Sequence, residues 1–168
     1  MRLKLHTPAI KEMDYRQKLL ADPDTMSYNR GQMLDAEGYD CATGCIDFPI
    51  TDWRYWRDVW LWREPSRFSA YILDEDSGEF VGEACYFYDM ESDACGTGVI
   101  IEARHRGRGY GTEALRLLAD RAFLQPDVDR LFVELPADRE NAVRMYLTAG
   151  FREVHSESGV VRLEKSKE

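Results

Sequence analysis

The residues best suited to chemistry lie in one basic, glycine-rich stretch, 104–112, which reads RHRGRGYGT. Three arginines in five residues supply local positive charge, and the alternating glycines let the backbone turn tightly and approach a ligand closely. A helix is predicted directly afterwards, over 110–124, so its unpaired N–H groups and positive dipole end would point into the same loop. This combination predicts a cradle for a pyrophosphate group. The alternative is a solvated glycine turn with surface arginines.

Two further residues could move protons. In the predicted strand 130–135, Glu134 shares one face with Phe132, and a lone carboxylate on a central strand is costly to bury unless it is paired or functional. Tyr146 lies on the apolar face of a predicted helix around 142–149. Each residue has a structural alternative, since Glu134 could be a satisfied structural acid and Tyr146 could belong to the core.

Two motifs in this order resemble those of a known family. Arg106, Gly109 and Gly111 form an Arg-x-x-Gly-x-Gly pattern between an apolar strand and a helix, and it resembles the acetyl-CoA-binding motif of the GNAT superfamily of N-acetyltransferases. Residues 142–151 read AVRMYLTAGF and resemble the second motif of that superfamily, A-[IV]-R-x-Y-x-x-x-G-F. The match covers residues 67–156, and the stretch 123–151 is most similar to aminoglycoside 6′-N-acetyltransferases and related amine acyltransferases.

The resemblance implies acetyl-CoA as co-substrate, with no metal. The backbone amides of the loop would hold the CoA pyrophosphate, with a hydroxyl added by Thr112, and the strand end 98–101 would line a gap for the pantetheine arm. Asn141 enters this set because Arg139 stands where the family usually has asparagine, seven residues before the motif tyrosine; Asn141 or Asp138 could replace that asparagine. The residues assigned to the cofactor are Val99, Ile100, Ile101, Arg106, Gly107, Arg108, Gly109, Tyr110, Gly111, Thr112 and Asn141.

The resemblance also implies catalytic roles. Tyr146 aligns with the tyrosine that serves the family as general acid toward the departing CoA thiolate, and Glu134 aligns with an acid that acts as base, directly or through water. The chemistry requires both roles, because an amine with a pKa of about 10 must lose a proton and the thiolate must gain one.

The elements that must position these residues form an α/β pattern, since the last two predicted helices each lie between strands. The resemblance implies a mixed, mostly antiparallel twisted sheet of six or seven strands flanked by helices. We expect a single N-acetyltransferase domain, 1–168, with the acceptor side in 1–65 and the acetyl-CoA-binding core in 67–156. The predicted strands are 3–5, 67–73, 79–88, 95–102, 130–135, 151–155 and 159–164, and the earlier helices are 9–20 and 52–63.

Local signals set several boundaries. Thr51 is predicted to cap the second helix, and Pro23 argues against extending the first. Gly150 is placed to end the last helix with a positive φ. The intervening stretch 26–49 is rich in Asp, Gly, Asn and Tyr and is predicted to be a long irregular segment, of the kind that is usually functional or mobile.

The composition limits the partners. Asp and Glu total 31 against 22 Lys and Arg among 168 residues, a net charge of −9 that disfavours nucleic acid and anionic membranes. No apolar run could span a bilayer, and the first residues lack the apolar stretch of a secretory signal, so we expect a cytoplasmic protein. The four cysteines match no zinc spacing and are expected to be free thiols. A homodimer is left open.

The acceptor site is expected in the first 65 residues, which hold all four tryptophans together with Tyr28, Tyr39 and Tyr55. Trp53, Trp56 and Trp60 share one helix face, and they either pin that helix to the sheet or form an aromatic wall for a cationic substrate. The loop before them carries four acids that could attract ammonium groups or simply be solvated: Asp35, Glu37, Asp40 and Asp47. The charge balance favours a small cationic amine as acceptor. A protein or peptide N-acetyltransferase and a non-catalytic acyl-CoA-binding module stay open as alternatives.

Overall fold

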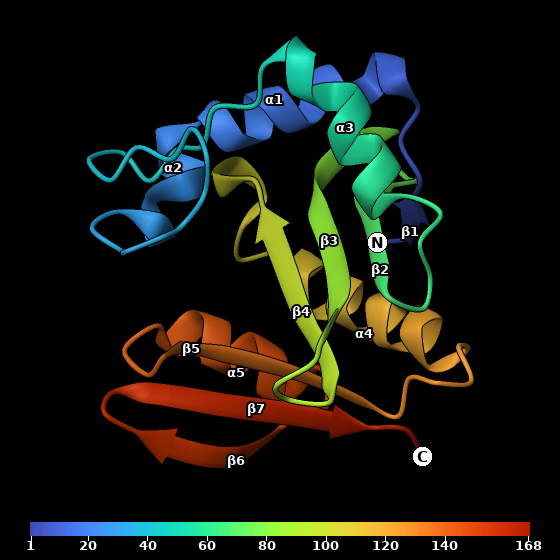
Figure 1. Cartoon of the computed structure of the whole chain (residues 1–168), viewed down its shortest axis with the longest axis vertical. Coiled ribbons are helices and arrows are strands. Elements are labelled where there is room, and N and C mark those ends of the chain that lie inside the picture. Colours follow the sequence, from blue (N-terminus) through green and yellow to red (C-terminus); the bar gives the residue numbers. More distant parts are fainter.

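The computed structural model covers all 168 residues, and a seven-stranded sheet with the order β1-β2-β3-β4-β5-β7-β6 runs through it (Figure 1). Every neighbouring pair is antiparallel except β4 and β5, which are parallel. The expected mixed, mostly antiparallel sheet is therefore confirmed. The strands are β1 (Leu3–His6), β2 (Arg67–Asp74), β3 (Glu79–Asp89), β4 (Ala94–Ile101), β5 (Arg130–Pro136), β6 (Arg152–Glu157) and β7 (Val160–Ser166).

Helices cover the sheet in two groups (Figure 1). In that view α4 and α5 lie behind the sheet, and with it they enclose the larger hydrophobic core. The first three helices lie at the upper end and enclose a smaller core, which includes Met13, Met26 and Trp56. The helices are α1 (Met13–Ala21), α2 (Pro23–Met26), α3 (Ile50–Trp60), α4 (Tyr110–Phe123) and α5 (Glu140–Thr148), with short 3-10 turns η1 (Ile10–Glu12), η2 (Ser27–Asn29) and η3 (Ala103–His105).

The strands β4 and β5 pair over a short distance and then separate. Their register contains two pairs, Cys95 with Leu131 and Gly96 with Phe132. At the next position the Thr97 hydroxyl donates to the Phe132 carbonyl, at 3.0 Å, in place of a backbone donor. From Gly98 onward β4 has no partner on β5, so one backbone edge of β4 is left open at the centre of the sheet.

The helices in the second half of the chain agree with the prediction. Helix α4 begins at Tyr110 and ends at Phe123, against the predicted 110–124. Gly150 follows α5 with φ of +94°, so the predicted left-handed ending is confirmed.

The first half departs from the prediction in its helix boundaries. Helix α3 begins at Ile50 because Pro49 already takes the extended N-cap conformation; Thr51 therefore does not cap it, and its hydroxyl contacts Asp52 instead. The first predicted helix is divided into η1 and α1. Pro23 starts a new helix, α2, because proline suits a first helical position and the Asp22 carboxylate accepts from the N–H groups of the next turn. No helix combines the length and apolar character that a membrane crossing requires.

Candidate active site

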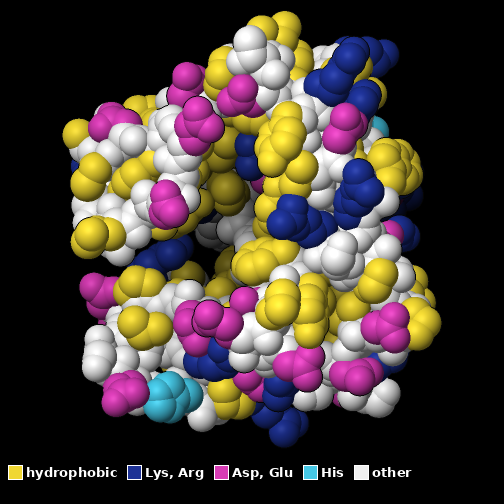
Figure 2. Space-filling model, viewed as in Figure 1, with side chains coloured by type: hydrophobic (Ala, Val, Ile, Leu, Met, Phe, Trp, Pro, Cys, Tyr) yellow, Lys and Arg dark blue, Asp and Glu magenta, His cyan; other side chains and the backbone are white.

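A cavity of about 780 Å³ lies between the open edge of β4 and helix α5. In the space-filling view it is the deep hollow between the upper helices and the β5–β7 part of the molecule (Figure 2). Ten of the eleven residues assigned to the cofactor line it, and Arg108 is the exception. The lining residues are Tyr28, Val99, Ile100, Ile101, His105, Arg106, Gly107, Gly109, Tyr110, Gly111, Thr112, Asp138, Arg139, Glu140, Asn141, Ala142, Arg144, Met145 and Thr148.

The glycine-rich loop forms one end of this cavity. Gly107 and Gly109 have φ of +74° and +84°, and no atom lies within 4 Å of the position that a Cβ on Gly107 would take. Gly109 is the N-cap of α4, and no side chain caps the helix there. The backbone N–H groups of the first turn are therefore free to bind an anion, with the helix dipole adding to the attraction. This is the environment that a pyrophosphate group requires.

The three arginines of the loop have different surroundings. Arg104 forms an ion pair with Glu102, at 2.7 Å, and Arg108 is exposed. The guanidinium of Arg106 donates to the carbonyl oxygens of Ile101 and Asp24, both at 3.2 Å, and also to that of Thr25. The side chain of Arg106 is thus bound to protein carbonyls, and its backbone remains the part that can meet a phosphate.

Tyr146 is buried next to the point where β4 and β5 separate. Its side chain is 4% exposed, and it is not among the residues that line the cavity. Its hydroxyl lies 3.4 Å from both the carbonyl oxygen and Oγ1 of Thr97, and it donates to the carbonyl. Burial raises the pKa of this phenol well above its ordinary value, so it stays protonated at neutral pH.

Glu134 lies away from the cavity lining, on β5. Its carboxylate accepts from Arg162 of β7 at 2.9 Å and is 54% exposed. Arg162 also pairs with Glu164, at 2.8 Å, and its guanidinium lies 4.1 Å from the centre of the Phe132 ring. The carboxylate is therefore paired and half in solvent, and the sheet does not bring it together with the loop residues.

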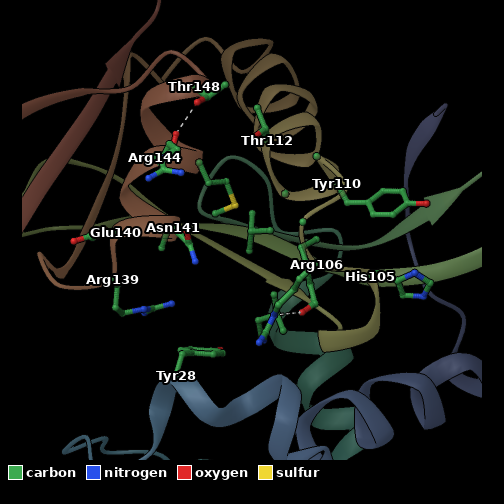
Figure 3. Close-up of a pocket in the computed structure, with 18 of the residues that line it drawn as sticks. Tyr28, His105, Arg106, Tyr110, Thr112, Arg139, Glu140, Asn141, Arg144 and Thr148 are labelled. Carbon is green, nitrogen blue, oxygen red and sulfur yellow. Dashed lines mark hydrogen bonds between the residues drawn. The ribbon is translucent and has the colours of Figure 1, made fainter.

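The start of α5 brings two residues to the other end of the cavity (Figure 3). Arg139 is the N-cap of α5, and its guanidinium carbon lies 4.7 Å from the centre of the Tyr28 ring. No carboxylate pairs with this guanidinium. Asn141 also lines the cavity. Burial raises the pKa of Tyr28. The sequence marked Arg139 as a departure from the family pattern. It placed Tyr28 among the aromatic residues of the half expected to form the acceptor site, but it did not predict the contact between Tyr28 and Arg139.

Trp53, Trp56 and Trp60 pack in or against the smaller core, whereas Trp62 is exposed, and none of the four lines the cavity. Trp56 and Phe48 hold the guanidinium of Arg16 between them, at 4.5 and 4.6 Å from their ring centres, and Arg16 pairs with buried Glu83 at 2.9 Å. Trp53 donates to the Phe48 carbonyl. This arrangement favours the packing interpretation of the tryptophan face. The four loop acids are likewise outside the lining.

Several solved structures share the fold at low sequence identity. Spermidine N-acetyltransferase from Vibrio cholerae, in complex with CoA and spermine, is 14% identical with a TM-score of 0.73, over 98% of this chain and 95% of that one. Aminoglycoside acetyltransferase AAC(6′)-Ib, in complex with coenzyme A and kanamycin, is 18% identical with a TM-score of 0.66, over 99% and 95%. The microcin C7 self-immunity acetyltransferase MccE, with acetyl-CoA and AMP, is 15% identical with a TM-score of 0.71, over 98% and 92%.

The sequence itself identifies the family. The Acetyltransferase (GNAT) family model matches residues 36–151, which include the glycine-rich loop and the tyrosine motif. The chain belongs to the GNAT family of acetyl-CoA-dependent N-acetyltransferases. No curated protein sequence matches it.

Proposed function

We propose that this protein transfers the acetyl group of acetyl-CoA to the primary amine of a small, cationic molecule. One observation carries the cofactor part of the proposal: a single cavity joins the free N-terminus of α4 to the open backbone edge of β4. The first would hold the CoA pyrophosphate. The second would hold the pantetheine arm through its unpaired N–H and C=O groups. Acetyl-CoA supplies the activated acetyl group when it is bound.

Tyr146 is proposed as the general acid. When the amine nitrogen bonds to the acetyl carbon, the carbon–sulfur bond breaks, and the sulfur needs a proton. A buried phenol with a raised pKa keeps its proton at neutral pH, and the Tyr146 hydroxyl lies beside Thr97, where the strands separate. To deliver this proton, the hydroxyl would have to turn from the Thr97 carbonyl toward the cavity, which Tyr146 does not line in this structure.

Glu134 is proposed as the base, acting through water. Its ion pair with Arg162 and its exposure favour an indirect role, because the carboxylate is not in the cavity lining. Asp138 and Glu140 do line the cavity, at the start of α5, and either could receive the amine proton instead. A carboxylate-to-amide substitution at each of the three positions separates these candidates through the low-pH limb of the kcat/KM profile.

The cationic nature of the acceptor is supported by charge. The net charge of −9 would attract ammonium groups from a distance, and two of the structural neighbours hold polyamines or aminoglycosides. Within the cavity, however, Arg139 is unpaired and would repel a cation at close range. The attraction would therefore act on the approach of the acceptor more than on its final position.

The experiment is a panel of amines and peptides, with CoA release measured in the presence of acetyl-CoA. Spermidine and kanamycin represent cationic acceptors, and short peptides represent the protein N-acetyltransferase alternative. For a cationic acceptor, kcat/KM falls steeply as salt is raised from about 0.01 to 0.15 M, because the Debye length shortens from about 30 to 8 Å. Salt-independent rates contradict a cationic acceptor. Binding of acetyl-CoA without release on any acceptor supports the non-catalytic module.

A further inference from the structure

The segment formed by α2 and η2, residues 23–29, carries Tyr28 to the cavity. Helix α2 has only four residues, and so short a helix has little stability of its own in water. The Asp22 carboxylate caps it, but the position of the segment depends on what it packs against. Two of its contacts are with Ala103, just before the glycine-rich loop, and with Arg106, near the start of that loop.

The first contact is a hydrogen bond from Ala103 to Thr25. Thr25 is fully buried, and its Oγ1 accepts from the Ala103 N–H at 2.9 Å while the same hydroxyl donates to Asp22. The bond joins residues 78 positions apart in the sequence. It attaches α2 to η3, the turn that leads directly into the glycine-rich loop.

The second contact is the guanidinium of Arg106. It donates to two consecutive carbonyls of α2, those of Asp24 and Thr25, and to Ile101 at the end of β4. Each of the three guanidinium nitrogens donates to a different carbonyl. A lysine ammonium carries its three N–H groups on one nitrogen and would not reproduce this planar, forked geometry. Arg106 is followed directly by Gly107, the open glycine of the loop. A phosphate bound at the backbone of Gly107 would therefore order the loop one residue away from Arg106, whose side chain holds α2.

Beyond Thr25 the segment reaches Tyr28, whose ring lies on Arg139 at the start of α5 (Figure 3). The contacts thus run from the glycine-rich loop through Arg106 and Thr25 to Tyr28 and across to α5. All of these residues except Thr25 line the cavity.

We propose that Arg106 and Thr25 are positioning residues that couple the cofactor loop to segment 23–29, so that binding of CoA at the loop fixes Tyr28 at the opposite end of the cavity. The inference rests on the proposed function, because it requires CoA to bind at residues 107–112. The role of the Arg106 side chain is then to order the acceptor side of the site, while its backbone amide serves the cofactor. The two sides of the site are coupled before any acceptor arrives.

The test is hydrogen–deuterium exchange of the whole protein with and without CoA as the probe. In the wild-type protein CoA is expected to slow exchange at residues 107–112 and, by about tenfold, at residues 24–30. In Arg106→Lys, which keeps the charge but loses the fork, slowing at 107–112 persists and slowing at 24–30 falls to about threefold or less. Thr25→Val, which breaks the other contact, reduces the slowing at 24–30 in the same direction and provides a second test if Arg106→Lys does not fold.

Arg130→Lys is the matched control. Arg130 also holds backbone carbonyls, those of Ser92 and Asp93, but between β3 and β4 and away from the cavity. This variant is expected to respond to CoA as the wild type does. A merely structural role for Arg106 would speed exchange at 24–30 equally with and without CoA, leaving the CoA-dependent difference intact, and that result overturns the proposal. If CoA protects neither 107–112 nor 24–30 in the wild-type protein, the proposed function fails, and the coupling fails with it.

Discussion

The two sides of the cavity are built in different ways. On the cofactor side, residues from β4 to α5 contribute nearly the whole lining, and their conformations follow from glycines and from a helix that starts without a cap. On the proposed acceptor side, the first 65 residues contribute only Tyr28, and the segment that carries it is held by hydrogen bonds of Asp24 and Thr25 to residues distant in the sequence. The cofactor site is therefore encoded locally, and the acceptor side depends on tertiary contacts.

The pairing of charged side chains follows the same division. In the first half, Arg16 lies between two aromatic rings and pairs with Glu83 in the interior. Near the loop, Arg106 meets only neutral carbonyls, so its positive charge is not cancelled by a carboxylate. An uncancelled charge beside the loop favours a phosphate, whereas the Arg16–Glu83 pair serves packing within the smaller core.

The largest expected effect tests whether Tyr146, on the cofactor side of the cavity, is the general acid. Tyr146→Phe is expected to lower kcat by about 100- to 1000-fold, because the departing thiolate loses its proton donor. The dissociation constant for acetyl-CoA should change by less than about twofold, since the ring is kept. Turnover is measured by CoA release with an amine from the panel, and binding is measured by titration calorimetry.

Tyr71→Phe is the matched control, because Tyr71 is a buried tyrosine of β2 that does not line the cavity. Burial also raises the pKa of Tyr71, and its hydroxyl contacts only the Glu12 carbonyl and Met13. Its kcat should stay near that of the wild type. Unchanged turnover in Tyr146→Phe removes this tyrosine from the mechanism. If the two variants lose kcat equally, the loss comes from removing any buried tyrosine hydroxyl and not from the position of Tyr146.

The next effect compares one glycine from each side. Gly44 has φ of +82°, and a Cβ there would lie 2.3 Å from the Met26 carbonyl oxygen and 2.9 Å from the Arg30 nitrogen. Gly44→Ala is therefore expected to lower the free energy of unfolding by about 3 kcal/mol, because both obstacles are backbone. A Cβ on Gly111 would meet the flexible thioether of Met145, at 2.3 Å. Gly111→Ala should change stability by less than about 1 kcal/mol, since helix propensity offsets the repacking.

Urea unfolding at equilibrium measures both glycine variants. If Gly111→Ala lowers the free energy of unfolding as much as Gly44→Ala does, the Met145 side chain between α4 and α5 cannot move aside, and this contact is as rigid as the backbone around Gly44. That outcome removes the distinction between a side that tolerates local change and one that does not.

The same division explains what could be predicted from the sequence. The loop, the limits of α4 and the ending at Gly150 were predictable because glycine conformation and helix termini are local properties. The start of α2 at Pro23 and the failure of Thr51 as a cap were missed because neighbouring residues, Asp22 and Pro49, took those roles. Tyr28 was named among the aromatic residues of the acceptor half, but its contact with Arg139 was not predicted. That contact depends on the hydrogen bonds of Arg106 and Thr25, which join residues far apart in the sequence and cannot be inferred from spacing.

The smallest expected effect concerns the bond that ties the start of α4 to the first half. The Tyr110 hydroxyl donates to the Asp74 carboxylate at 2.7 Å, and this bond holds the pKa of Asp74 below its ordinary value. A depressed folded-state pKa contributes stability above the unfolded pKa of about 3.9, and that contribution is lost as pH falls through the folded value. Tyr110→Phe should therefore lower Tm by about 2–4 °C at pH 5–7 and by progressively less below pH 4.

Thermal unfolding across this pH range, without CoA, measures the effect, and Tyr55→Phe is the control because its side chain is exposed and makes no hydrogen bond. A Tm difference for Tyr110→Phe that stays constant down to pH 2 would mean that Asp74 does not titrate against this bond. In that case the ion pair between Arg121 and Glu64, together with apolar packing, holds α4 to the first half. The contact through Arg106 and Thr25 would then be the main polar link between the cofactor loop and the acceptor side.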